Sequence, residues 1–233
     1  MAFLPCAPGL IGETVTELLA LDRANSQVLC ALRNGRAGTK LLNQLCRDRF
    51  TAGAPEVSVW SEELDCVKLL GLRQGDSVLC TRNMWSLGLQ NGSLGTIVEV
   101  AELLQPPSEG LGDETDRPLA WIEWDDGLRR PLTLDMLDDI ELGFAVTVHK
   151  AQGSQWPRVI VPVTSSRLLD RTMLYTALTR AQRQVLLVGD VDAARFATLA
   201  PPRASERKVA LDLALMRLLK AGPEPALRLP LPH

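Results

Sequence analysis

Apolar residues recur at helical spacing near the start of the chain and then give way to shorter apolar runs. In residues 13–24, Val15, Leu18 and Leu19 recur at helical spacing beside acidic residues, which predicts a short leading helix. Residues 27–32 (QVLCAL) form a compact apolar run, and residues 39–50 (TKLLNQLCRDRF) return to helical spacing after a stretch of turn residues. A strand, a loop and a helix are therefore expected over 27–50.

From residue 75 onward the pattern changes to short strands separated by tight turns. Asn91-Gly92 and Asp126-Gly127 are typical hairpin turns, and the polar stretch 105–118, rich in Pro and Gly, is expected to be a mobile loop. The expected strands are DSVLCTR (76–82), LGTIVEV (94–100), LAWIEW (119–124) and LRRPLTL (128–134). This pattern predicts a small antiparallel barrel.

After the predicted barrel, nearly continuous apolar strands alternate with helical segments. The expected elements are a strand in 143–149, a strand in 158–163, a helix over about 166–183 and a strand in 184–190. Strands of this kind are typical of a parallel sheet covered by helices on both faces. The predicted fold class is therefore α/β.

The change of pattern also predicts how the chain is divided. Residues 27–71 and 141–200 form one discontinuous α/β domain, and residues 72–140 form the inserted barrel. Residues 1–26 are a leading segment, and residues 201–233 contain a terminal helix over 205–220 and a loose tail.

The composition and charge of the chain indicate its cellular compartment more clearly than its function. The 233 residues carry a formal net charge of −3, so any contact with nucleic acid has to come from a local basic cluster or from backbone amides. Five scattered cysteines without a C-x-x-C spacing indicate neither a disulfide framework nor a zinc site, and they suit a reducing cytoplasm. Neither a signal peptide nor a membrane-spanning segment is expected.

Two segments carry candidate chemistry. In 147–155 (TVHKAQGSQ), a strand end is followed by small polar residues and a glycine, which can place amides and hydroxyls against phosphates. In 175–181 (YTALTRA), a helix carries hydroxyls and Arg180 near its end. An arginine held there can reach a γ-phosphate and stabilise the charge that develops during phosphoryl transfer.

Together these two segments resemble motifs V and VI of superfamily 1 helicases. Residues 28–43 (VLCALRNGRAGTKLLN) resemble the start of the second RecA-like domain of RecD-type helicases. Residues 78–100 (VLCTRNMWSLGLQNGSLGTIVEV) resemble the Src-homology-3-like barrel that these helicases insert into that domain. The four segments occur in the family's order over roughly residues 27–190. The resemblance therefore implies a RecA-like sheet with an inserted barrel.

The resemblance also implies roles for ten residues. Those implied to face single-stranded DNA are Thr147, His149, Lys150, Ser154 and Thr176, and those implied to face the nucleotide are Gly153, Gln155, Tyr175, Thr179 and Arg180, with Arg180 as the arginine finger. Gln155 departs from the family, which usually has a glutamate there. The amide can still accept a hydrogen bond from a ribose hydroxyl, but it brings no negative charge.

Taken one at a time, several of these residues have ordinary interpretations. Arg180 alone would be a solvated helix charge, paired with Asp170 or Asp190, and Lys150 would be a surface lysine. Tyr175 could equally pack its helix against the sheet. Trp85, Trp121 and Trp124 are expected to fill or flank the barrel, with base stacking by one exposed tryptophan as the alternative.

By the resemblance, the parent activity is ATP-dependent 5′ to 3′ DNA unwinding in recombination and double-strand-break repair. The phosphate-binding pattern G-x-x-x-x-G-K-[ST] does not occur in the sequence. No acidic pair is placed to bind magnesium either, because Asp125-Asp126 lies in a hairpin turn and Asp138-Asp139 follows no apolar strand. We therefore expect ATP and Mg²⁺ to be held mostly by an amino-terminal RecA-like domain outside this sequence. RecB-like and RecC-like subunits are possible further partners. Two alternatives stay open, namely a non-catalytic DNA- or partner-binding module and the helicase portion of a conjugative relaxase.

Overall fold

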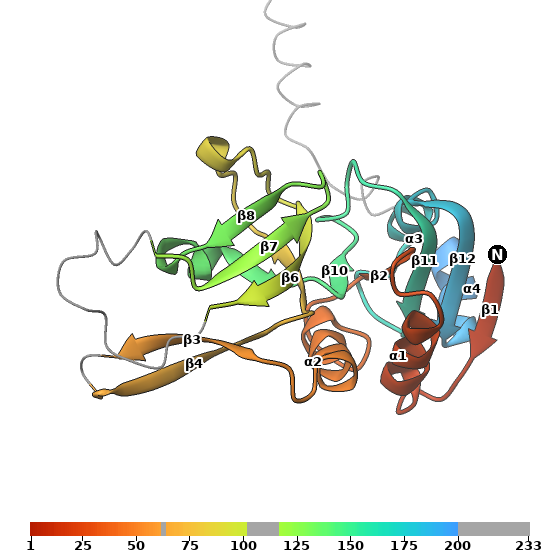
Figure 1. The fold of residues 1–233 in the computed structure, drawn as a ribbon. Helices are drawn as coiled ribbons and strands as arrows, with labels where there is room; N and C mark the ends of the chain where they lie inside the picture. Colours follow the sequence, from red (N-terminus) through yellow and green to blue (C-terminus); the bar gives the residue numbers. More distant parts are fainter. Residues whose placement is uncertain (62–63, 102–116, 200–233) are drawn as a thin grey trace, which may run out of the picture.

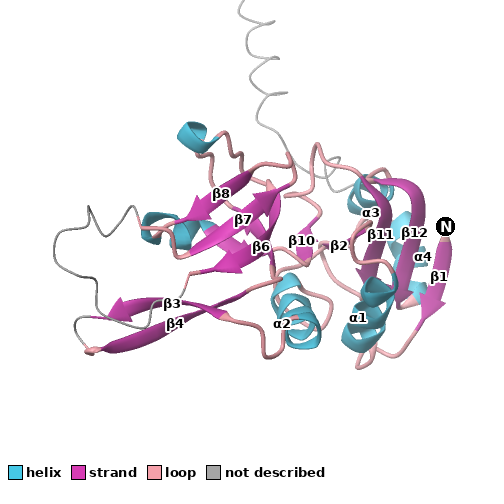
Figure 2. Ribbon diagram, viewed as in Figure 1, coloured by secondary structure: helices cyan, strands magenta, loops and turns pink. Residues whose placement is uncertain are grey.

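The computed structural model describes residues 1–61, 64–101 and 117–199. Its first layer is a five-stranded parallel sheet in the order β1-β12-β11-β2-β10 (Figures 1 and 2). The strands are β1 (Ala2–Pro5), β2 (Ser26–Cys30), β10 (Ala145–Thr147), β11 (Trp156–Val163) and β12 (Ala181–Gly189). The predicted parallel sheet is confirmed.

Helices cover both faces of this sheet, as the continuous apolar strands predicted. The helices are α1 (Ile11–Leu21), α2 (Thr39–Phe50), α3 (Arg171–Leu178) and α4 (Val191–Leu199). One face packs α1 and α2 against Val28, Ile160 and Val188, and the other packs α3 and α4 against Val159 and Leu187. The two apolar clusters together make the core of the α/β layer.

The amino-terminal residues belong to this sheet, which differs from the expectation of a separate leading segment over 1–26. β1 pairs in parallel with β12, and α1 packs against β2, β11 and β12. β1 is four residues long, lies at the sheet edge and is largely exposed, so its sequence carries no buried apolar run that would reveal a strand. The division of the rest of the chain into domains stays a prediction.

The predicted antiparallel unit is present as a second five-stranded sheet, in the order β8-β7-β6-β5-β9, here called the insert (Figure 1). Its strands are β5 (Ser77–Cys80), β6 (Leu94–Val100), β7 (Ala120–Trp124), β8 (Arg129–Leu132) and β9 (Ile140–Leu142). Its core includes Ile97, Ile122 and Trp124, which are buried. The Asp126-Gly127 turn joins β7 to β8, with Gly127 at a φ of +76° that favours glycine.

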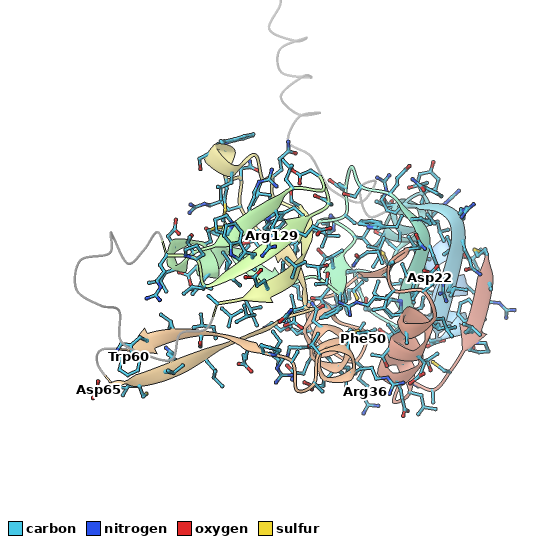
Figure 3. All side chains as sticks on the ribbon, in the orientation of Figure 1. Asp22, Arg36, Phe50, Trp60, Asp65 and Arg129 are labelled. Carbon is cyan, nitrogen blue, oxygen red and sulfur yellow. The ribbon has the colours of Figure 1, made fainter. Side chains whose placement is uncertain are left out.

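A β-hairpin that the apolar pattern did not predict precedes the insert. Its strands are β3 (Glu56–Ser61) and β4 (Cys66–Arg73), and its far end carries Trp60 and Asp65 (Figure 3). Val57 and Leu72 at its base are buried in the core of the insert. The sequences of β3 and β4 are rich in apolar residues, yet most of the hairpin beyond its base is exposed or half-buried.

Some predicted elements are shorter or lie outside the described residues. The helix expected over 166–183 is present only as α3, because Asp170 caps its start by accepting a hydrogen bond from the Met173 amide at 2.8 Å. The loop expected over 105–118 lies mostly outside the described residues, and the terminal helix over 205–220 lies wholly outside them. Among the described helices, none has the length and apolar character to cross a membrane.

A buried carboxylate links the α/β layer to the insert. Asp76, which is fully buried, accepts hydrogen bonds from the Thr51 hydroxyl at 2.7 Å and from the Arg73 amide at 2.8 Å. Burial raises the pKa of Asp76, against the lowering effect of these donors and of the charges on Arg47 and Arg73. Arg23 donates to the Gly75 carbonyl beside it. The start of β5 is thus tied to the end of α2.

Replacing Thr51 by valine is expected to lower the free energy of unfolding by about 2 kcal/mol, because buried Asp76 would lose a hydrogen-bond donor. Urea denaturation followed by circular dichroism measures the loss. Thr96→Val, at an exposed strand position, is the matched control and should stay within about 0.5 kcal/mol of the wild type. An equal effect of the two substitutions would mean that the buried hydrogen bond contributes nothing to stability.

Candidate nucleic-acid and nucleotide interface

The register of the parallel sheet separates the ten predicted site residues into two groups. Thr147, the last residue of β10, pairs with Cys30, the last residue of β2. Trp156, the first residue of β11, pairs with Ala181, the first residue of β12. Residues 148–155 therefore run from the carboxyl edge of the sheet to its amino edge, and they link the two groups.

The group at the carboxyl edge consists of Thr147, His149 and Lys150. A tight turn follows β10, in which the amides of Lys150 and Ala151 donate to the Thr147 carbonyl at 2.9 and 3.2 Å. The turn leaves the His149 side chain exposed and brings Lys150 Nζ to 3.1 Å from a Glu141 carboxylate oxygen. An exposed imidazole and a cation at a strand end suit contact with a phosphate backbone.

The group at the amino edge surrounds Arg180. The Arg180 side chain donates from Nε to the Thr176 carbonyl at 3.3 Å, from Nη1 to the Ser154 carbonyl at 3.4 Å, and from Nη2 to the Thr179 hydroxyl at 3.3 Å. Among the described residues no carboxylate pairs with it, so neither Asp170 nor Asp190 neutralises its charge. Long bonds to neutral oxygens orient the guanidinium and leave its charge uncompensated.

The other residues of this group lie on α3 and on the end of the linking segment. Tyr175 is 68% exposed, so it does not pack α3 against the sheet. Gly153 has a φ of +92°, a conformation that favours glycine, and Gln155 is exposed. Ser154 and Thr176, both expected to face DNA, lie beside Arg180. Their role stays a prediction.

Two buried amide side chains position the site, and the sequence analysis did not identify them. Asn43 Nδ2 donates to the carbonyls of Leu142 and Ala145 at 3.0 and 2.9 Å, and its Oδ1 accepts from the Ala145 amide at 2.7 Å. Gln27 Nε2 donates to the carbonyls of Gly143 and Phe144, both at 3.1 Å. Asn43 stands between Leu42 and Cys46 on the buried face of α2, and a polar residue on such a face is the signal that could have revealed it.

The insert touches the linking segment directly. A Cβ on Gly92 would lie 3.0 Å from the Lys150 carbonyl, so the Asn91-Gly92 turn rests against the turn that follows β10. Asn83 Oδ1 accepts from the Asn91 amide at 2.8 Å, which agrees with the turn predicted at Asn91-Gly92. Of the tryptophans expected in the insert, Trp124 is buried and Trp85 is 75% exposed on a 3₁₀ turn.

Comparison with known proteins shows which family this region resembles. Residues 142–188, which contain both groups, match the family model of the UvrD-like helicase C-terminal domain. This part of the chain is therefore similar to the carboxy-terminal domain of UvrD-like helicases, which are superfamily 1 helicases.

Within that class the chain is related to the RecD-type helicases, as the resemblance of its motifs predicted. It is 30% identical over 84% of its length to the ATP-dependent RecD2 DNA helicase of Deinococcus radiodurans, covering 23% of that protein. It is 31% identical over 91% of its length to the RecBCD enzyme subunit RecD of Mycobacterium tuberculosis, covering 32% of it. The chain thus spans a third or less of these relatives.

Two further similarities were found. The probable conjugal transfer protein TraA of Sinorhizobium fredii is 31% identical over 73% of this chain, which covers 14% of that protein. Among solved structures, a Pif1 helicase from Bacteroides in complex with ADP-AlF3 and ssDNA matches 90% of this chain and 51% of its own, at 19% identity and a TM-score of 0.47.

Proposed function

We propose that this chain is the carboxy-terminal motor region of an ATP-driven DNA helicase that moves 5′ to 3′ along single-stranded DNA. The observation that carries the proposal is the single segment 148–155, which joins the group of His149 and Lys150 to the group around Arg180. A shift of one group is transmitted to the other through only a few residues. Closing of a nucleotide cleft at one edge would therefore move the DNA contact at the other.

In this proposal ATP is bound between the amino edge of the sheet and an amino-terminal RecA-like domain, outside this sequence, that carries the phosphate-binding loop. Arg180 stabilises the charge that develops on the γ-phosphate, and Gln155 accepts a hydrogen bond from the ribose. Among the described residues no three His, Cys, Asp or Glu side chains group as a metal site. We assign the magnesium ligands to that amino-terminal domain.

The proposal is tested first by single-stranded DNA binding, measured as the fluorescence anisotropy of a labelled oligothymidylate at several salt concentrations. The chain is expected to bind with an affinity that falls as salt rises, because phosphate contacts release counterions. His149→Ala should weaken binding about 3- to 10-fold, equivalent to about 1 kcal/mol, by removing an exposed donor.

The matched control is Arg195→Ala, which removes an exposed cation on α4 that, among the described residues, forms an ion pair with Asp192. This variant should bind like the wild type. Equal losses in the two variants would mean that binding is non-specific and does not involve the turn after β10. ATP turnover by the chain alone is expected to be absent, and turnover stimulated by DNA would show that the chain holds a phosphate-binding element of its own.

The similarity to TraA proteins favours one further candidate, the helicase portion of a conjugative relaxase. Both candidates use the same motor region, so DNA binding does not separate them, whereas a DNA-nicking domain in the same polypeptide would. The mycobacterial relative is by name a subunit of the RecBCD enzyme. By analogy we propose RecB-like and RecC-like partners and a role in recombination and double-strand-break repair, which co-purification with such subunits tests.

A further inference from the structure

Three charged side chains from separate parts of the chain meet beside the turn that follows β10. Arg33 Nη2 lies 2.8 Å from one carboxylate oxygen of Glu141, and Lys150 Nζ lies 3.1 Å from the other. Arg33 follows β2 and Lys150 follows β10, and these strands are neighbours in the parallel sheet. Glu141 comes from β9, the last strand of the insert. A carboxylate of the insert thus bridges two cations of the carboxyl edge.

The two cations belong to a local excess of positive charge on an acidic chain. Residues 31–40, which comprise the loop that carries Arg33 and the start of α2, also contain Arg36 and Lys40 and have no acidic residue, although the chain as a whole carries a net charge of −3. Figure 3 places Arg36 near the helices α1 and α2. Among the described residues, Glu141 is the acidic residue that forms ion pairs with both Arg33 and Lys150.

Glu141 is held as an anion in this cluster. Partial burial pushes its pKa upward, but the hydrogen bond and charge of Lys150 and the charge of Arg33 outweigh that effect, so the pKa is lowered. The side chains of Arg33 and Glu141 are nevertheless about half exposed, at 55% and 43%. Ion pairs with this exposure contribute about 0–1 kcal/mol, so another anion can replace the carboxylate at small cost.

We propose that Arg33 and Lys150 form a clamp for one backbone phosphate of single-stranded DNA, and that the Glu141 carboxylate occupies this clamp until DNA displaces it. A phosphate presents two oxygens to two cations in the same way as a carboxylate, and an arginine fork suits that geometry. Because Glu141 belongs to the insert, its release removes one of the contacts between the insert and the turn after β10, while the contact made by Gly92 stays. This inference rests on the proposed DNA binding and adds Arg33 as a contact and Glu141 as a competitor.

The test measures binding of the labelled oligothymidylate by Glu141→Gln, Arg33→Gln and the double variant, using the full chain. Glu141→Gln is expected to bind about 3- to 10-fold more tightly, because the glutamine amide competes poorly for two cations. Arg33→Gln is expected to bind several-fold more weakly, with the slope of log affinity against log salt reduced by about 0.7. In the double variant the gain from Glu141→Gln should shrink, because one cation of the clamp is absent.

Glu99→Gln is the matched control, since Glu99 is an exposed glutamate of the insert that pairs with Arg129 and its loss changes the net charge equally. The clamp is overturned if Glu141→Gln raises the DNA affinity no more than Glu99→Gln does, or if Arg33→Gln binds DNA as the wild type does. The proposed DNA binding stands in both cases. If no variant and no wild-type protein binds DNA, both fall. If free ATP abolishes the increase in DNA affinity that Glu141→Gln produces, the clamp binds a nucleotide and is overturned as a DNA site. Thermal unfolding of each variant confirms that it is folded.

Discussion

Replacing Arg180 by alanine is expected to lower ATP turnover about a thousandfold in a complete motor, because an arginine finger stabilises the transition state by that factor or more. The motor is assembled from this chain and the part of the Deinococcus radiodurans RecD2 helicase that the chain does not match. Within the described part of the chain the guanidinium makes only long bonds, to the Thr176 and Ser154 carbonyls and the Thr179 hydroxyl, so its removal costs the fold little. ATP hydrolysis in the presence of single-stranded DNA measures the loss.

Two controls separate the role of the Arg180 guanidinium from charge and from folding. Arg183→Ala removes an exposed arginine three residues further on and should leave turnover within about twofold of the wild type. Arg180→Lys keeps the charge but not the planar fork and should recover only a small part of the rate. DNA binding by the chain should be the same in all three variants. Turnover that survives Arg180→Ala would assign the finger to another residue.

Replacing Asn43 by alanine is expected to lower the free energy of unfolding by about 3–4 kcal/mol, since each buried backbone group left without a partner costs about 1–3 kcal/mol. Three such groups lose their partner, namely the carbonyls of Leu142 and Ala145 and the amide of Ala145. β10 is an edge strand of three residues, so it has few other hydrogen bonds to hold it. Urea denaturation measures the loss, and hydrogen exchange at Val146 and Val148 reports loosening of the strand.

Gln44→Ala provides the matched control for Asn43→Ala. Gln44 is the next residue of α2, is exposed and donates to Asp48 at 3.0 Å, so its removal should change the free energy of unfolding by about 0.5 kcal/mol or less. Similar losses in both variants would show that α2, rather than the Asn43 amide, is sensitive to truncation. If Asn43→Ala is much less stable than Gln44→Ala, the Asn43 amide itself holds β10 and the turn that follows it.

Local patterns in the sequence were enough to predict the kinds of element and much of their order. The apolar runs at 27–32 and 158–163 are strands of the parallel sheet, and the Asp126-Gly127 turn joins two antiparallel strands of the insert. These predictions succeeded because backbone periodicity and turn chemistry act over a few residues. β1 and the hairpin of β3 and β4 were missed although their sequences are apolar, because β1 has only four residues and no Asn-Gly or Asp-Gly pair marks the turn of the hairpin.

The sequence by itself thus determined the α/β class, the insert and the chemical identity of the site residues. The tertiary structure decided where those residues lie: Thr147 at one edge of the sheet, Arg180 at the other, and Glu141 against Lys150 and Arg33. Strand order and register arise from contacts between residues far apart in the chain, and the apolar side chains that drive them are largely interchangeable among strands. Periodicity reveals which face of a strand is buried, whereas only the folded chain selects the neighbour that buries it.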